Sequence, residues 1–136
     1  MACVSLIDFS GGNESIGSFS KAKKNLERDV YMDHRETIYC GAKFDAKKNV
    51  IPPAGFTTTK HKKQAKRIEW DHVVPADNFG RTFSEWRDGY SQCVNSKGKV
   101  FKGRKCAEKM NKEYRLMQAD MYNLFSCYWG RKCCEK

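Results

Sequence analysis

A carboxylate and an imidazole stand side by side within residues 67–76. They belong to Asp71 and His72, and apolar residues surround them. A neutral imidazole with a pKa of about 6.5 can accept a proton at physiological pH, and a carboxylate offers the hard oxygen that Mg²⁺ prefers. The pair therefore predicts metal-assisted hydrolysis in which His72 is the general base and Asp71 is a metal ligand.

Asn123 is the third candidate for this chemistry. It lies near the end of a predicted helical run, in the segment Asp120-Met121-Tyr122-Asn123-Leu124. Magnesium keeps several waters and is commonly held by few protein groups together with substrate phosphate. One carboxylate from Asp71, one amide oxygen from Asn123 and a phosphate fit that preference.

The neighbouring positions of Asp71 and His72 impose a stereochemical condition. Adjacent side chains of a regular strand point to opposite faces, so the two could line one site only at a bend or a strand end. Glu69 shares the face of Asp71 and is its rival as the acidic ligand.

The elements that must position these residues are mixed, which predicts the α+β class. Ser18 or Ser20 can cap a helix that carries Phe19, Ala22, Leu26 and Val30 on one side. Strands are predicted over 37–40 and 67–74, a loop over 49–59, a short helix within 79–89 and a long helix over 106–124. The apolar stripe of that long helix and the aromatic residues Phe79, Phe83 and Trp86 are expected to be core.

Length and net charge limit the number of domains and the kinds of partner that the chain can have. The 136 residues suit one domain, and 26 Lys+Arg against 16 Asp+Glu give a net charge of +10 and a pI near 9.3. Such a balance favours anionic partners. The basic run 60–67 and the Gly-punctuated loop 95–105 suit a phosphate backbone, and solvated surface is the alternative for both.

Seven cysteines favour an oxidising compartment. Cys93 and Cys106 bracket the basic loop and could close it as a disulfide, with two free thiols as the alternative. No Cys-x-x-Cys spacing supports zinc. Residues 1–9 lack the features of an export signal, and no run approaches the length of a membrane span, so no membrane partner is expected.

Three segments resemble the bacterial endonuclease I family of periplasmic and secreted nucleases. They are Phe19-Ser20-Lys21-Ala22-Lys23-Lys24, the whole of 67–76, and Met117-Gln118-Ala119-Asp120-Met121-Tyr122-Asn123-Leu124, and the resemblance covers roughly 18–124. It implies a ββα-metal (His-Me finger) core with additional helices, stabilised by disulfides. It also implies cleavage of DNA, and often RNA, with little sequence preference and with 5′-phosphate products.

Carried over residue by residue, the resemblance implies that His72 is the general base and that Asp71 and Asn123 hold one Mg²⁺, with Mn²⁺ or Ca²⁺ as alternatives. Asp71 departs from the more usual glutamate. The arginine that some members place after a Trp-x-x-Gly turn to hold the cleaved phosphate is missing from Gly89-Tyr90-Ser91-Gln92. Arg81, Arg87 and Arg104 are candidates to replace it.

The chain departs from the family after Leu124, which predicts three regions: a flexible lead-in (1–17), a nuclease domain (18–124) and an aberrant tail (125–136). Members continue with a segment like x-Pro-Ala-Ile-Gly. The codons of 125–130, read one base further on, permit Phe/Ser-Pro-Ala-Ile-Gly, so we hypothesise a truncation or frameshift there. An intact reading frame with no homologous frame downstream would overturn the hypothesis.

Two functions remain open at this point. The first is a monomeric, magnesium-dependent, non-specific endonuclease acting on DNA and also on RNA. The alternative is a truncated, catalytically inactive remnant that only binds nucleic acid. A third, weaker hypothesis is a small basic disulfide protein that binds membranes or polyanions without metal.

Overall fold

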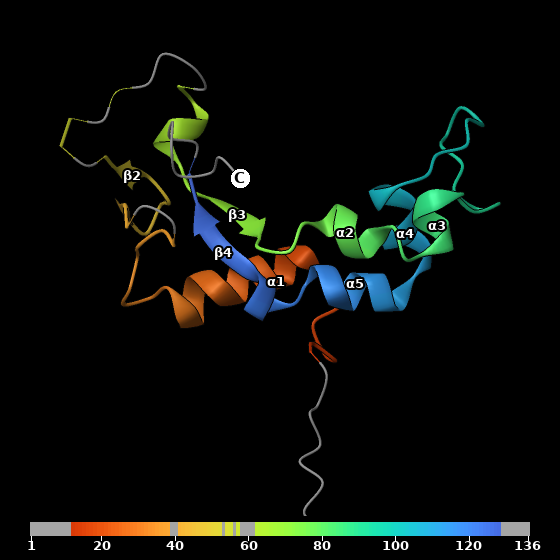
Figure 1. Ribbon diagram of the computed structural model, residues 1–136, viewed down its shortest axis with the longest axis horizontal. Coiled ribbons are helices and arrows are strands. Elements are labelled where there is room, and N and C mark those ends of the chain that lie inside the picture. Colours follow the sequence, from red (N-terminus) through yellow and green to blue (C-terminus); the bar gives the residue numbers. More distant parts are fainter. Residues whose placement is uncertain (1–11, 39–40, 53, 56, 58–61, 129–136) are drawn as a thin grey trace, which may run out of the picture.

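The computed structural model describes residues 12–38, 41–52, 54–55, 57 and 62–128. The molecule is elongated, with α1 and the strands toward one end and α2 to α5 extending toward the other (Figure 1). Its helices and short strands agree with the expected α+β class. The elements are α1 (Phe19–Asn25), β1 (Lys43–Phe44), β2 (Val50–Ile51), β3 (Glu69–His72), α2 (Ala76–Gly80), α3 (Ser84–Arg87), α4 (Arg104–Met110), α5 (Lys112–Gln118) and β4 (Leu124–Cys127).

Two antiparallel strand pairs organise the first end. β1 pairs with β2, and β3 pairs with β4 so that Asp71 faces Phe125 and His72 faces Leu124. All four helices α2 to α5 lie in the connection between β3 and β4. The β3–β4 pair therefore returns the chain to His72 about fifty residues later, immediately after Asn123.

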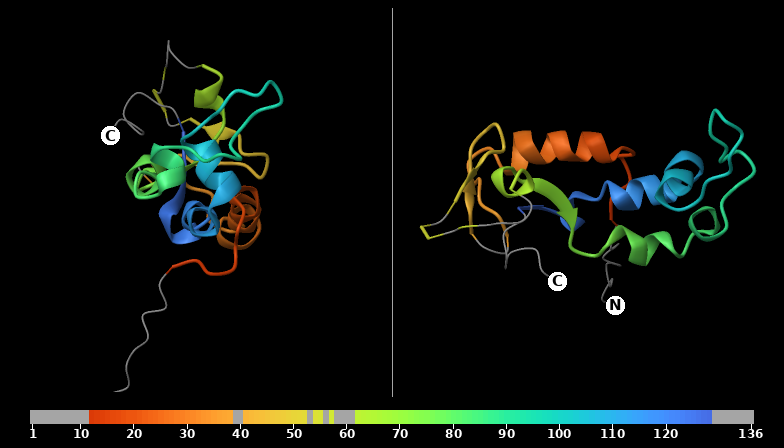
Figure 2. Two further views of the ribbon diagram at one scale, coloured as in Figure 1. Left: turned by 90° about the vertical axis from the view of Figure 1, so that its right-hand side faces the viewer. Right: turned by 90° about the horizontal axis from the view of Figure 1, so that it is seen from above.

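α1 lies along the β3–β4 pair, as the views in Figure 2 also show. Ser18 caps its start by accepting a hydrogen bond from the backbone N–H of Lys21 (3.4 Å), as predicted. Ala22 and Leu26 are buried against Ala119 and Leu124. Val30, expected on the same face, is 54% exposed, because residues Leu26–Val30 form a π-helical turn that shifts the helical phase.

A second core cluster lies among the helices of the other end. It confirms the expected aromatic core, since Phe83 and Trp86 pack against the buried residues Ala76, Phe79, Ala107 and Tyr114. Gly80 is needed there, because a Cβ at this position would lie 2.4 Å from the Trp86 ring. Burial raises the pKa of the Tyr114 hydroxyl, and the nearby charge of Arg104 opposes this rise.

The long helix predicted over 106–124 is wrong, because the chain breaks at Asn111. This residue is extended (φ −116°, ψ 116°), and its side chain accepts the backbone N–H of Tyr114 at 2.9 Å, which caps α5. After α5 the chain forms a 3-10 turn at Met121–Asn123 and then β4. The stripe is core in part: Ala107, Tyr114 and Leu124 are buried, whereas Met117 is 38% exposed.

The strand predicted over 37–40 is also wrong for Thr37 and Ile38, the two of its residues that the structure describes. Thr37 closes a tight turn, in which its carbonyl accepts the backbone N–H of Gly41 (3.0 Å) and its hydroxyl accepts that of Ala42 (3.0 Å). Residues 39–40 lie outside the described part of the chain. The loop predicted over 49–59 contains β2.

β4 crosses the boundary that the sequence suggests after Leu124. Ser126, Cys127 and Tyr128 are buried, and Ser126 and Cys127 pair with Trp70 and Glu69. The first residues after the boundary are thus built into the sheet. The frameshift stays a prediction that sequencing of the gene can test, and residues 129–136 lie outside the described part.

The disulfide predicted between Cys93 and Cys106 is present, with the two Cα atoms 5.5 Å apart. The chain-entropy account gives a bridge of this separation a stabilisation of about 3 kcal/mol. Cys3, Cys40, Cys133 and Cys134 lie outside the described residues. None of the helices in the described part has both the length and the apolar character needed to cross a bilayer.

Candidate active site

His72 is the last residue of β3 and is 5% exposed. Its Nε2 lies 2.9 Å from the backbone carbonyl oxygen of Gln118, at the end of α5. Because a carbonyl oxygen can only accept, Nε2 carries the hydrogen, and the lone pair of the neutral ring is on Nδ1. The fold thus selects the tautomer in which Nδ1 can accept a proton.

Two phenyl rings hold the imidazole in place. Phe19 of α1 stacks on it with ring centroids 5.2 Å apart, and Phe79 of α2 meets it edge-on at 5.8 Å. Phe79 in turn contacts Tyr114 in the second core cluster. The imidazole of His72 therefore lies where the two clusters meet, in a setting that restricts its rotation.

Asp71 lies on the exposed face of β3, as strand alternation requires. Its Oδ1 accepts the backbone N–H of His72 at 2.9 Å, so the carboxylate is turned toward the end of the strand. Two adjacent side chains can line one site only at a bend or a strand end, and β3 does end at His72. Glu69 shares this face and is also exposed.

Asn123 lies across from the residues that follow His72. Its backbone carbonyl accepts the N–H of Val73 (3.0 Å), its Oδ1 accepts the N–H of Val74 (2.8 Å), and its Nδ2 donates to the carbonyl of Val74 (3.1 Å). The β3–β4 pair thus brings Asp71, His72 and Asn123 to one end of the sheet.

The oxygen donors at this end fit a magnesium ion better than a zinc ion. The amide oxygen of Asn123 has a second lone pair beside the one that Val74 uses, and Asp71 supplies a carboxylate. Within the described residues no cluster of three or more His, Cys, Asp or Glu side chains could hold a metal by itself. A site with two protein oxygens, waters and phosphate suits Mg²⁺.

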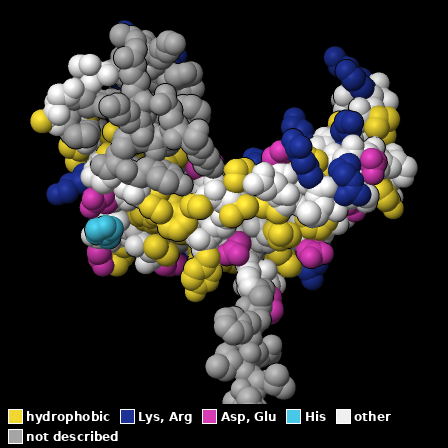
Figure 3. Space-filling view, viewed as in Figure 1, with side chains coloured by type: hydrophobic (Ala, Val, Ile, Leu, Met, Phe, Trp, Pro, Cys, Tyr) yellow, Lys and Arg dark blue, Asp and Glu magenta, His cyan; other side chains and the backbone are white. Residues whose placement is uncertain are grey.

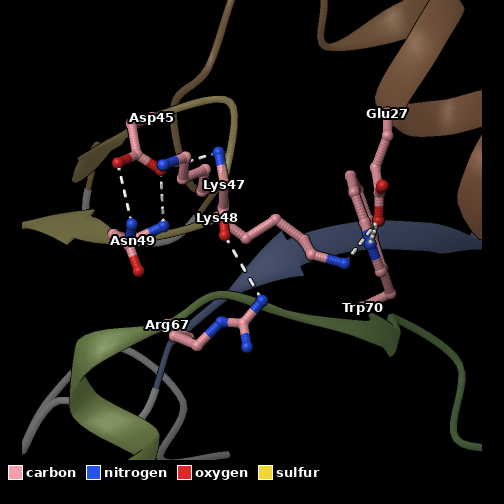
Figure 4. A network of polar contacts seen from close by, with 7 residues as sticks. All are labelled: Glu27, Asp45, Lys47, Lys48, Asn49, Arg67 and Trp70. Atoms are coloured by element: carbon pink, nitrogen blue, oxygen red, sulfur yellow. Dashed lines mark hydrogen bonds and ion pairs between the residues drawn. The ribbon is translucent and has the colours of Figure 1, made fainter.

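A polar network that no local sequence pattern predicts holds β3 against the π-helical turn after α1 (Figure 4). Glu27 Oε1 accepts from Lys48 Nζ at 2.9 Å and from Trp70 Nε1 at 3.0 Å. Burial alone would raise the pKa of Glu27, but these two hydrogen bonds and the charges of Lys48 and Lys23 outweigh it and bring the pKa below its ordinary value. Trp70, two residues before His72, is thereby fixed.

Replacing Glu27 with glutamine is expected to reduce stability at neutral pH and to flatten its fall in acid. The pKa of Glu27 is depressed in the folded state, so the carboxylate stabilises the fold above its unfolded pKa of about 4.3, and this contribution disappears as the pH falls through the lower folded value. Urea unfolding followed by tryptophan fluorescence between about pH 3 and pH 7 measures the effect. The matched control is the exposed Glu113→Gln, and equal pH slopes in wild type and Glu27→Gln would refute the prediction.

The three arginines that were candidates for the phosphate contact all lie at the helical end of the molecule. Arg81 pairs with Asp77 (2.6 Å), and Arg87 Nη1 donates to the carbonyls of Arg81 (2.7 Å) and Thr82 (2.8 Å). Arg104 approaches the Tyr114 hydroxyl. The contacts of all three arginines thus lie within the helical end of the molecule.

Basic side chains gather over the helical end of the molecule (Figure 3). The loop between the two disulfide cysteines carries Lys97, Lys99, Lys102, Arg104 and Lys105, all of them exposed. Asn95 shapes the loop by accepting the backbone N–H groups of Lys97 and Lys99, each at 2.9 Å. Of the second basic run, Lys62, Lys63, Lys66 and Arg67 are exposed, and residues 60–61 lie outside the described part.

Comparison with known proteins finds bacterial nucleases. An extracellular deoxyribonuclease of Aeromonas hydrophila is 38% identical over 112 residues, which cover 79% of this chain and 43% of the relative. A periplasmic deoxyribonuclease of the same organism is 36% identical over 113 residues (79% and 41%). Endonuclease-1 of Buchnera aphidicola subsp. Baizongia pistaciae is 35% identical over 112 residues (79% and 39%). No protein-family model matches.

The chain is therefore a homologue of bacterial nucleases, and it spans about two fifths of the length of these curated relatives. The names of these relatives, deoxyribonuclease and endonuclease-1, confirm the resemblance to the bacterial endonuclease I family.

Proposed function

We propose that this protein is a magnesium-dependent, non-specific endonuclease that hydrolyses phosphodiester bonds of DNA, and also of RNA, to leave 5′-phosphate ends. The observation that carries the proposal is the Nε2 contact of His72 with the Gln118 carbonyl, which leaves the Nδ1 lone pair as the proton acceptor. The extracellular and periplasmic relatives support a role outside the cytoplasm, and the ββα-metal core remains part of the proposal.

In this mechanism His72 removes a proton from the attacking water through Nδ1, while Nε2 keeps its hydrogen on the Gln118 carbonyl. Phe19 and Phe79 hold the ring in one orientation, which lowers the cost of reaching the reactive geometry. Asp71 and Asn123 would hold the metal ion. A bound magnesium ion would neutralise the charge that develops on the phosphate and assist the leaving 3′-oxygen.

The second candidate function is a catalytically inactive remnant that binds nucleic acid. The exposed basic side chains of the loop between the disulfide cysteines, Lys97, Lys99, Lys102, Arg104 and Lys105, favour it. The net charge of +10 supports binding in either case.

A plasmid-nicking assay on the purified, oxidised chain separates the two functions. Conversion of supercoiled to open-circular DNA in magnesium, stopped by EDTA, supports the endonuclease. DNA binding without nicking at any magnesium concentration supports the remnant instead. Nicking that continues in EDTA would overturn the metal-dependent mechanism.

A further inference from the structure

An open cavity of about 570 Å³ lies between α1, β3 and the turn that joins β1 to β2. Ser20, Lys23 or Lys24, and Glu27 recur at the spacing of one helix face, so α1 and the π-helical turn that follows it supply one wall. β3 supplies the opposite wall with the three residues that lead toward Asp71 and His72. The lining residues are Ser20, Lys23, Lys24, Glu27, Lys48, Ile68, Glu69 and Trp70.

The positive charge of this cavity is only partly compensated. Lys48 is paired with Glu27 at 2.9 Å. Among the described residues no acidic group lies within ion-pair distance of Lys23 or Lys24. Glu69 lies at the exposed face of β3. The ammonium groups of Lys23 and Lys24 thus form no ion pair within the described residues, although the charge of Lys23 also acts on Glu27.

Lys23 is also close to the proposed base. Its Nζ lies 4.7 Å from the centroid of the Phe19 ring, and the same ring stacks on His72 with centroids 5.2 Å apart. A single phenyl ring thus separates a cation of the cavity from the imidazole. A strand whose scissile phosphate reaches His72 must continue in both directions, and the cavity lies beside the strand that carries His72.

We propose that Lys23 and Lys24 form a subsite for a phosphate next to the one that is cleaved, within a single strand of nucleic acid. The inference rests on the proposed function. Lysine ammonium groups bind phosphate as point charges without a fixed fork geometry, which suits a site that takes any sequence.

The test measures binding in EDTA, where hydrolysis plays no part. The probe is a fluorescein-labelled single-stranded oligonucleotide of about 12 nucleotides, and anisotropy titrations of the full chain are repeated over a series of KCl concentrations. Lys23→Gln and Lys24→Gln are each expected to weaken binding several-fold and to reduce the slope of log K against log salt by about 0.7. Lys21→Gln is the matched control, because Lys21 is exposed on the same helix and does not line the cavity.

The outcomes are distinct. Selective loss in Lys23→Gln and Lys24→Gln, with circular dichroism unchanged, supports the subsite. Equal loss in all three variants, or no loss in any, overturns it, since binding would then follow total charge or another surface. In magnesium, the two variants should raise KM with little change in kcat. If the wild type binds but never nicks, the proposed function fails while the binding result still decides the subsite.

Discussion

Replacing His72 with alanine is expected to lower the rate of plasmid nicking in magnesium by about 100-fold to 10,000-fold, the usual contribution of a general base. The imidazole is placed for this role by its hydrogen bond to Gln118 and by the rings of Phe19 and Phe79. DNA binding in EDTA should stay within a few-fold of wild type, because the buried ring contributes no charge when neutral. The measurement is the initial rate of open-circle formation under single-hit conditions.

The control for this variant is His34→Ala, since the side chain of His34 is 80% exposed. It should nick at the wild-type rate. Because His72 is buried, urea unfolding of His72→Ala must show that the variant remains folded under assay conditions. Nicking by folded His72→Ala at the wild-type rate would exclude the proposed base.

Replacing Asp71 with alanine is expected to raise the magnesium concentration needed for half-maximal nicking by at least 10-fold to 100-fold, which is the loss typical even for outer partners of metal ligands. Asp71 is exposed at the end of β3, but its Oδ1 accepts the backbone N–H of His72, so the unfolding of the variant must be measured in parallel. Asp71→Glu restores the carboxylate that is more usual in the family and should recover most of the activity. Magnesium titrations of the nicking rate measure both effects.

Glu69→Ala is the matched control for Asp71→Ala, because Glu69 lies on the same exposed face two residues away. Glu69→Ala should leave the magnesium dependence of nicking unchanged. If Glu69→Ala raises the magnesium requirement and Asp71→Ala does not, Glu69 is the acidic metal ligand instead. Asn123→Ala should also raise the magnesium requirement. Its two side-chain hydrogen bonds to Val74 contribute about 1 kcal/mol each to stability, so its unfolding must be measured in parallel.

Local signals in the sequence were sufficient for several elements. The cap at Ser18 and the spacing of Ala22 and Leu26 predicted α1 because these signals act within one or two helical turns. The mixture of apolar and ionisable residues around Trp70 predicted β3, although the strand is shorter than expected. The disulfide across the basic loop could be predicted because both cysteines flank one short segment.

Contacts between distant segments could not be predicted in the same way. The pairing that brings Asn123 to the end of β3 joins residues about fifty positions apart, and no local pattern marks it. The network of Glu27, Lys48 and Trp70 draws on three separate elements. The apolar periodicity continues across Asn111 and therefore predicts a continuous helix there. In the structure the side chain of Asn111 instead bonds to the nearby backbone and caps α5.

The acceptor that selects the tautomer of His72 is a peptide carbonyl and not a side chain. The side chain of Gln118 is engaged elsewhere, with its Nε2 donating to Glu108 at 3.1 Å. A substitution at position 118 therefore cannot delete the acceptor and can reach it only by altering the path of the backbone at the end of α5. The hydrogen bond that fixes the tautomer of His72 is in this sense insensitive to which side chain stands at position 118.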